Sequence, residues 1–187
     1  NNVDLAAAKK SGVLVCNVRA YATASVVQHV FSLMLALNRK LFQYTRSASN
    51  GDWSQSEYFC YFGEQISELQ GKTIGIIGYG ELGRAVAQVA SCFGMKVLLA
   101  RKHNAADALA PGEERVALED LLSGSDVVTL HCPLTEDNYH MISSDAFSMM
   151  KADAILINTA RGGLVDEPAL VKALDDQQIA GAGLDVL

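Results

Sequence analysis

The chain has 187 residues, half of them hydrophobic and 19% charged, which fits one globular α/β domain and argues against disorder. Its formal net charge of −6 argues against nucleic acid or an anionic membrane surface as a partner, because both favour a basic face. The four cysteines lie far apart, with no Cys-x-x-Cys pair and no histidines at zinc spacing, so we expect free thiols in the cytoplasm and no metal site.

The first 70 residues contain one long helix candidate. Apolar residues recur at a helical period from Thr23 to Leu41 and predict a largely buried helix. Its most apolar part, residues 26–37, is too short to span a bilayer, and no signal peptide precedes it. Before the helix, residues 3–10 are typical of a short helix and 13–16 of a strand. After it, residues 42–70 mix aromatic and polar side chains, which indicates either a local mini-core or a surface that docks on a partner.

After Gly71 the chain alternates strands and helices. Strands are predicted at 73–77, 96–100, 126–131, 154–158 and 181–186, and helices at 82–93, 118–122, 143–149 and 167–176. Asp166 precedes the last helix and is interpreted as its cap rather than as a catalytic group. Because continuous apolar strands are linked by single helices, the sequence predicts a doubly wound, Rossmann-like parallel sheet covered on both faces.

The turn after the first of these strands carries the most informative motif, Gly78-Tyr79-Gly80-Glu81-Leu82-Gly83. Gly78 permits the tight turn, Gly80 lets the backbone approach phosphates, and Gly83 lets the helix pack closely on the strand. A glycine-rich turn is often only a turn, but this one follows an apolar strand and opens an amphipathic helix. That context favours a dinucleotide site, with the pyrophosphate at the helix N-terminus.

The second strand is followed by basic residues. Arg101 and Lys102 stand about twenty residues after the turn, where an NAD-binding domain places an acidic residue on the ribose 2′-hydroxyl. A guanidinium cannot accept that hydrogen bond, but it can pair with a 2′-phosphate. The pair therefore indicates either NADP binding or a solvated surface pair.

Three further strand ends carry candidate residues. Arg161, between Ala160 and two glycines, is well placed to hold a carboxylate and polarise a carbonyl, although a surface arginine in a loop is the competing interpretation. His131-Cys132-Pro133 and Asp185 are candidates for lining the cofactor by position only.

Together these motifs strongly resemble the D-isomer-specific 2-hydroxyacid dehydrogenases, and the resemblance runs from Asn1 to Leu187. It is carried above all by Asn158-Thr-Ala-Arg-Gly-Gly-Leu-Val-Asp-Glu167, and by the glycine turn, Phe93-Gly-Met-Lys-Val97 and His131-Cys-Pro-Leu-Thr135. The Glu81-Leu82 pair and residues 17–29 are most similar to the glycerate dehydrogenase (hydroxypyruvate reductase) branch.

The resemblance implies roles for single residues. The backbone of Glu81 and Leu82 would meet the pyrophosphate, and Arg101 would occupy the ribose-selecting position. Arg161 matches the substrate-binding arginine. The expected residues lining the nicotinamide and its ribose are Cys132, Thr159, Ala160 and Asp185, with Asp185 near the carboxamide.

The resemblance also implies an organisation for the chain. Residues 1–22 would be a segment at the substrate-domain boundary and 23–187 the dinucleotide-binding domain, with 23–41 as the interdomain helix and 42–70 as the arm of a homodimer. The implied activity is NAD(P)-dependent hydride transfer to or from a small 2-keto or 2-hydroxy acid.

Two departures from the family pattern affect these expectations. The acidic ribose selector is absent, which favours NADP. The family's glutamate and proton-donating histidine would lie beyond Leu187, and none of His29, His103, His131 or His140 matches that motif, so we expect this stretch alone to be inactive. The sequence leaves the particular acid open. It also leaves open a dinucleotide-sensing regulatory module of the corepressor type, and a Rossmann-like methyltransferase is a weaker rival.

Overall fold

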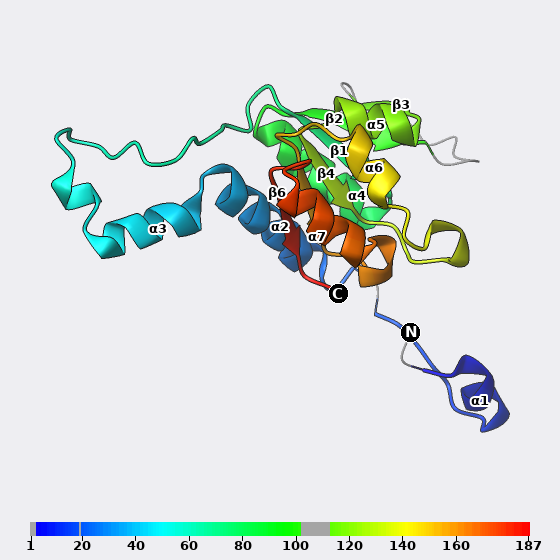
Figure 1. Ribbon diagram of the computed structural model, residues 1–187. Helices are drawn as coiled ribbons and strands as arrows, with labels where there is room; N and C mark the ends of the chain where they lie inside the picture. Colours follow the sequence, from blue (N-terminus) through cyan, green and yellow to red (C-terminus); the bar gives the residue numbers. More distant parts are fainter. Residues whose placement is uncertain (1–2, 19, 102–112) are drawn as a thin grey trace.

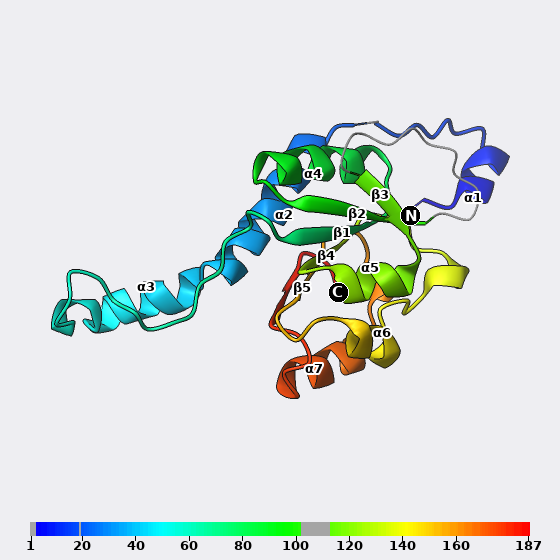
Figure 2. The same cartoon turned by 90° about the horizontal axis from the view of Figure 1, so that it is seen from above.

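The computed structural model describes residues 3–18, 20–101 and 113–187. Within them, six parallel strands form one sheet in the order β3-β2-β1-β4-β5-β6 (Figures 1 and 2). The strands are β1 (Thr73–Ile77), β2 (Lys96–Ala100), β3 (Glu113–Val116), β4 (Val127–Leu130), β5 (Ile155–Asn158) and β6 (Gly181–Leu184). The order reverses between β1 and β4, which confirms the predicted doubly wound sheet and puts a topological switch point at their carboxyl ends.

Helices cover both faces of the sheet, as Figure 2 shows. The helices that cover the sheet are α2 (Thr23–Asn38), α4 (Glu81–Cys92), α5 (Leu118–Gly124), α6 (Ser144–Met149) and α7 (Glu167–Asp175). Helices α1 (Leu5–Lys10) and α3 (Leu41–Asn50) lie away from it, and the 3-10 turns are η1 (Trp53–Gln55), η2 (Glu136–Asn138) and η3 (Gly162–Leu164). No helix of the described residues is long and apolar enough to cross a membrane.

Each face of the sheet has its own apolar core. Helices α2 and α4 cover one face, where Val30, Met34 and Val86 are fully buried against β-strand residues. Helices α5, α6 and α7 cover the other face, around Phe147 and Leu121. Strands β1, β4 and β5 are buried nearly throughout, which explains why they read as continuous apolar runs in the sequence.

Helix α2 ends earlier than the sequence predicts. The expected helix over 23–41 stops at Asn38, because Lys40 takes a left-handed conformation (φ 50°) and α3 starts at Leu41 in a new direction. In Figure 1, α3 and the chain that returns from it project away from the sheet. This arm, residues 41–66, exposes large apolar side chains; the most exposed are Phe42, Tyr58, Phe59 and Phe62.

Three details differ from the sequence-based prediction. Strand β3 was not predicted, because Glu113-Glu-Arg-Val has a single apolar residue and lies at the sheet edge. The segment 42–70 was expected to be irregular but contains α3, and residues 13–16 form no strand. The interpretation of Asp166 is confirmed, since its carboxylate accepts a hydrogen bond from the Ala169 amide and caps α7.

Candidate functional site

The glycine turn has the geometry that phosphate binding requires. Gly78 has φ +102°, and a Cβ there would lie 2.5 Å from the Cys132 nitrogen, so only glycine fits. A Cβ on Gly83 would overlap the carbonyl oxygen of Gly78. At Gly80 a Cβ would meet nothing within 4 Å, and no side chain caps the start of α4 there. The backbone therefore leaves open space in front of a helix N-terminus, which suits an anion.

Helix α4 begins with Glu81 and Leu82, next to the amino end of α2. The Glu81 carboxylate accepts a hydrogen bond from the Thr23 hydroxyl, which ties the starts of the two helices together. The side chain of Glu81 is thus occupied with α2, and its backbone amide belongs to the first turn of α4. Both features fit a role in which the main chain, rather than the carboxylate, meets the ligand.

A cavity of about 520 Å³ lies beside this turn, at the carboxyl ends of β1, β2 and β4. It brings together six of the predicted site residues, Gly78, Gly80, Arg101, His131, Cys132 and Pro133. Eight other residues complete the lining, namely Ile77, Tyr79, Ala100, Arg115, Leu118, Thr135, Asn138 and Met141. The cavity is therefore at the switch point, where open α/β sheets bind their ligands. Lys102 lies outside the described residues.

The β2 end of the cavity is basic. Arg101 follows β2 and is exposed, and Arg115 of β3 donates a hydrogen bond from Nη1 to the Ala100 carbonyl (3.3 Å). The guanidinium carbons of Arg84 and Arg115 lie 4.6 Å and 5.6 Å from the ring centroid of Tyr79. Sequence reasoning missed Arg115 because it missed β3. The order of a doubly wound sheet could have signalled that strand, since a third strand belongs beside β2.

His131 and Cys132 are uncharged lining groups. Burial lowers the pKa of His131 to about 4, so its imidazole is neutral at pH 7. Its Nε2 lies 2.9 Å from the Thr129 hydroxyl, and its buried Nδ1 has no hydrogen-bond partner among the described residues. Burial raises the pKa of the Cys132 thiol, which a backbone hydrogen bond opposes only in part, so Cys132 is no activated nucleophile. Both can line a cofactor, but neither is prepared for acid–base or covalent chemistry.

Outside the cavity lining, the predicted residues Glu81, Leu82 and Gly83 form the first turn of α4. Thr159, Ala160, Arg161 and Asp185 also lie outside it and follow β5 and β6 at the same edge of the sheet. Arg161 is exposed, and its Nη1 donates to the Ala160 carbonyl (2.6 Å). The hydroxyl of Thr159 is buried without a hydrogen-bond partner among the described residues. Asp185 pairs with His29 of α2 at 3.3 Å, a contact between residues 156 positions apart in sequence that only the fold reveals.

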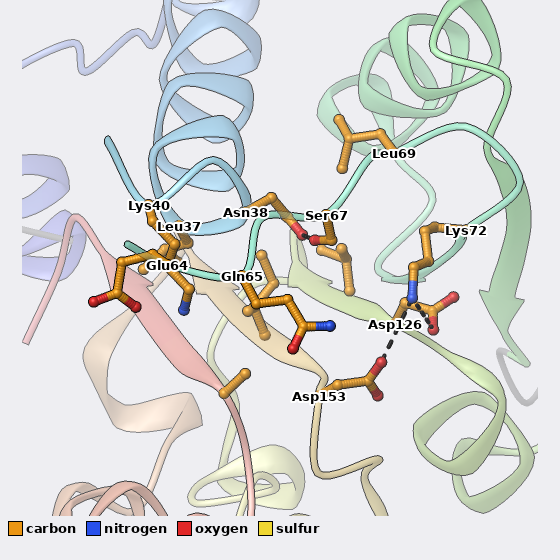
Figure 3. Close-up of a pocket in the computed structure, with 13 residues that line it drawn as sticks. Leu37, Asn38, Lys40, Glu64, Gln65, Ser67, Leu69, Lys72, Asp126 and Asp153 are labelled. Carbon is orange, nitrogen blue, oxygen red and sulfur yellow. Dashed lines mark hydrogen bonds and ion pairs between the residues drawn. The ribbon is translucent and has the colours of Figure 1, made fainter. Parts of the chain in front are cut away.

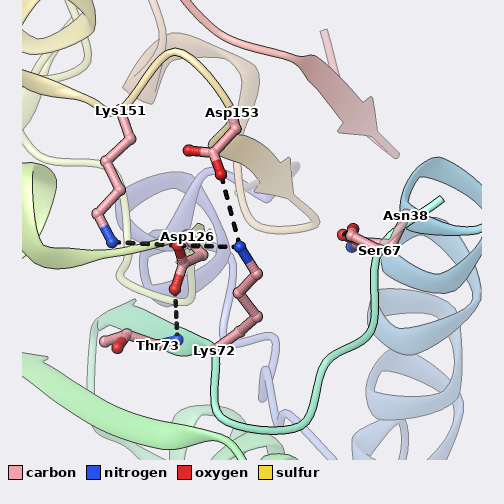
Figure 4. Close-up of polar contacts among 7 residues, drawn as sticks. All are labelled: Asn38, Ser67, Lys72, Thr73, Asp126, Lys151 and Asp153. Atoms are coloured by element: carbon pink, nitrogen blue, oxygen red, sulfur yellow. Dashed lines mark hydrogen bonds and ion pairs between the residues drawn. The ribbon is translucent and has the colours of Figure 1, made fainter. Parts of the chain in front are cut away.

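A second cavity, of about 350 Å³, lies at the opposite, amino edge of the sheet (Figure 3). The carboxylate of Asp126, whose side chain is 15% exposed, is paired on both of its oxygens (Figure 4). Its carboxylate accepts from the Thr73 amide (2.7 Å) and from Lys151 (3.1 Å), and Lys72 lies 3.5 Å away. Burial alone would raise the pKa of Asp126, but these hydrogen bonds and the two lysine charges outweigh it and lower the pKa. This network is structural.

No group of three or more histidine, cysteine, aspartate or glutamate residues in the described part of the chain could hold a metal ion. The site therefore consists of a glycine turn, an open helix start, a basic rim and, along the same edge, an arginine loop. Two buried polar atoms there, His131 Nδ1 and Thr159 Oγ1, have no hydrogen-bond partner in the part of the chain that the structure describes. These features fit a dinucleotide, which has phosphates for the turn and polar groups for such atoms.

Comparison with known sequences decides the family. The model of the D-isomer specific 2-hydroxyacid dehydrogenase NAD binding domain matches residues 31–187. The chain belongs to this family. Glycerate dehydrogenase of Methylorubrum extorquens is 50% identical over 185 residues, which cover 99% of this chain and 57% of that protein. The chain thus spans little more than half the length of this curated dehydrogenase.

Solved structures of the family have the same fold. D-lactate dehydrogenase from Lactobacillus jensenii with NAD+ matches with a TM-score of 0.84 at 36% identity, covering 99% of this chain and 54% of that one. An acyclic imino acid reductase in complex with NADPH and D-Arg matches with a TM-score of 0.85 at 37% identity, covering 98% and 57%. The matched region is an NAD-binding domain, and of these two neighbours one carries NAD+ and the other NADPH. The regulatory-module alternative finds no support in these relatives.

Proposed function

We propose that this chain is the coenzyme domain of an oxidoreductase that transfers a hydride between NAD(P)(H) and C2 of a small D-2-hydroxy or 2-keto acid of the glycerate and hydroxypyruvate type. The observation that carries the proposal is the shared edge of the sheet. The glycine turn after β1 and Arg161 after β5 both stand at carboxyl ends of parallel strands. The 50% identity to a glycerate dehydrogenase supports the substrate class.

The proposed roles follow from the chemistry of each group. Backbone amides at Gly80, Glu81 and Leu82 hold the pyrophosphate, and Gly83 keeps α4 close to β1. His131, Cys132 and Pro133 line the cofactor, and Thr159, Ala160 and Asp185 support its nicotinamide end. The nicotinamide, when bound, supplies or accepts the hydride. Arg161 binds the substrate carboxylate with its two-pronged guanidinium and polarises the adjacent carbonyl, so that charge developing on its oxygen is stabilised.

We further propose that Arg101 selects for NADPH. A guanidinium at the ribose end of the cavity favours a 2′-phosphate over a hydroxyl, and Arg115 adds a second positive charge on the same rim. The lactate dehydrogenase carries NAD+ and the imino acid reductase carries NADPH, so these relatives leave the finer choice to experiment.

The proposed domain organisation keeps residues 1–22 as a boundary segment and 23–187 as the cofactor domain. The arm is proposed to form a homodimer contact, because it projects away from its own sheet (Figure 1) and exposes large apolar side chains. The aromatic contacts within the arm, such as Tyr44 with Tyr61, also give it a small core of its own. The four cysteines are free thiols, which supports a reducing compartment such as the cytoplasm.

The activity is tested in the full-length protein. NADPH or NADH is mixed with hydroxypyruvate, glyoxylate or pyruvate, and loss of absorbance by the reduced nicotinamide is followed. We expect turnover in the usual enzyme range of roughly 1 to 10³ per second for at least one acid. Arg161→Ala should lower kcat/KM by on the order of 10²- to 10³-fold while cofactor affinity stays unchanged. No turnover with any of the acids, or an equal loss of cofactor affinity in the variant, contradicts the assignment.

The dimer is tested by light scattering over a dilution series. The wild type should have twice the mass of one chain at micromolar concentration. Phe59→Ser, which removes a side chain that is 98% exposed, should shift the protein toward monomer with unchanged thermal stability of the domain. A monomeric wild type at all concentrations would leave the arm as a local mini-core.

A further inference from the structure

Asn158 is the last residue of β5 and one of the few buried polar residues of the described chain, with 1% of its surface exposed. Its side chain makes hydrogen bonds to two backbone groups of the turn that follows. The Oδ1 accepts a hydrogen bond from the Ala160 amide (3.0 Å), and the Nδ2 donates to the Arg161 carbonyl (2.9 Å). Its own backbone carbonyl accepts from the Asp185 amide (3.0 Å). One buried residue thus ties the Arg161 turn to the strand end beside it.

The two hydrogen bonds of the Asn158 side chain fix the backbone from which the Arg161 side chain extends. The guanidinium itself is exposed, and the one hydrogen bond it makes among the described residues is to the Ala160 carbonyl (2.6 Å). Because Asn158 holds the amide of residue 160 and the carbonyl of residue 161, it fixes the backbone on both sides of the peptide to which the guanidinium is bonded. An exposed arginine would otherwise sample many rotamers, at a considerable entropy cost on binding.

The chemistry of the amide explains why this position carries asparagine. A side chain of this length must donate to one partner and accept from the other, which an amide does and a carboxylate does not. An apolar residue would remove the Asn158 acceptor from the half-buried Ala160 amide and would leave the Arg161 carbonyl with only the longer hydrogen bond from the Leu164 amide (3.3 Å). We infer that Asn158 is a positioning residue, which holds the turn so that the Arg161 guanidinium faces the substrate. This inference rests on the proposed function.

The test exchanges the amide for a carboxyl in the full-length protein. In Asn158→Asp the ionised carboxylate still accepts from Ala160 but faces the Arg161 carbonyl without a proton to donate. We expect kcat/KM for the preferred 2-keto acid to fall by on the order of 10²-fold at pH 7.5, with the affinity for the reduced cofactor unchanged. As the pH falls and the carboxyl gains a proton, it donates again, and the variant should recover toward wild type.

The recovery separates positioning from simple damage to the fold. Activity is expressed as the ratio of variant to wild type at each pH, so that titration of groups common to both, including His29 and Asp185 near the turn, largely cancels. Burial favours the protonated carboxyl, whereas the Ala160 hydrogen bond and the Arg161 charge favour the ionised one, so the ratio is followed from above pH 7.5 down to the lowest pH at which the variant remains folded. Asn158→Ala, which lacks both polar atoms, should show a similar loss with no recovery.

Asp126→Asn is the matched control, because it makes the reverse exchange at the amino edge of the sheet. It should change stability without changing kcat/KM. Full activity of Asn158→Asp at pH 7.5, or a loss that does not recover while the variant remains folded, overturns the inference. If the aspartate variant does not fold, Asn158→Ser is used; unchanged kcat/KM then overturns the inference, and a loss with unaltered cofactor affinity supports it. An inactive wild type would instead refute the proposed function.

Discussion

The two edges of the sheet have opposite polar chemistry. At the amino edge, Asp126 has a backbone amide and two lysines within reach, and its charge is neutralised in place. At the carboxyl edge, Thr159 and His131 each keep a buried polar atom without a partner among the described residues, and Gly80 faces open space. Both edges border a cavity, so a hollow alone does not mark a site.

The difference teaches how to recognise the functional edge. Buried polar groups in a folded protein normally have hydrogen-bond partners, so an unpaired group next to open space is a candidate for a hydrogen bond to a bound ligand. At the amino edge the Ser125 hydroxyl is also buried without a partner among the described residues, but the carboxylate of Asp126 is paired within the chain. The carboxyl edge combines orphaned polar atoms with glycines whose missing side chains leave room, and it is the edge to which we assign the cofactor.

The largest expected effect separates two glycines of the same turn. Gly78→Ala should destabilise the protein by roughly 3 to 5 kcal/mol, because φ is +102° and the new Cβ would meet the backbone of His131 and Cys132. Gly80→Ala should change stability by less than about 1 kcal/mol, since its Cβ meets nothing. It should nevertheless weaken cofactor binding roughly 10- to 100-fold by keeping phosphates off the amides. Denaturation and calorimetric titration measure the two effects. Unchanged affinity in Gly80→Ala would remove the pyrophosphate from this turn.

The pH dependence of stability should show the two edges in separate windows. The folded pKa of His131 is lowered to about 4, so its contribution is present above the unfolded value of about 6.5 and is lost as the pH falls toward 4, by about 3 kcal/mol. The pKa of Asp126 is also lowered, so its smaller contribution is lost only below the ordinary aspartate pKa of about 3.9. The free energy of unfolding should be measured by chemical denaturation at a series of pH values. Its decrease between pH ~6.5 and ~4 should be smaller in His131→Gln, and its decrease below pH ~3.9 should be smaller in Asp126→Asn. If His131→Gln instead changed only the lower pH range and Asp126→Asn only the higher one, the assignment of the two ranges to these residues would be wrong.

The smallest expected effect concerns the choice of cofactor. Arg101→Ala should weaken NADPH binding about tenfold and leave NADH binding unchanged, a modest effect because the guanidinium is exposed. Lys72→Ala removes a positive charge from the amino edge and should alter neither affinity. Calorimetric titration with both cofactors provides the ratio of the NADPH and NADH dissociation constants. A ratio that is the same in Arg101→Ala and wild type would leave the basic rim as a solvated surface.

Much of the fold could be predicted because local and tertiary signals agree. The five predicted strands match the observed ones within two residues, since buried parallel strands are continuous apolar runs. Strand β3 lacks that signal, because an edge strand needs little apolar surface. The break at Lys40 was also missed, because the helical period continues through Leu41 and a left-handed lysine has no sequence signature.

The site was predictable only in part, for a related reason. Glycines with a specific backbone task stand next to one another in sequence, so Gly78 and Gly83 could be interpreted from the motif alone. Arg115 reaches the cavity from a strand that was not predicted, and the pairing of His29 with Asp185 joins α2 to the end of β6. Such contacts depend on tertiary structure. The binding roles themselves stay predictions.

Helix α2 packs on β5 and β6, with Val30 and Met34 completely covered and Leu33 held against Gly183. This arrangement has a consequence for synthesis on the ribosome. Strand β6 follows the end of α2 by about 140 residues, which take roughly 7 to 30 s to translate. During that time α4 and then β5 can cover part of the apolar face of α2, and β6 adds the last part of that cover. The part of α2 around Leu33 therefore stays uncovered until β6 has been made, and the packing of this helix is completed only when β6 joins the sheet.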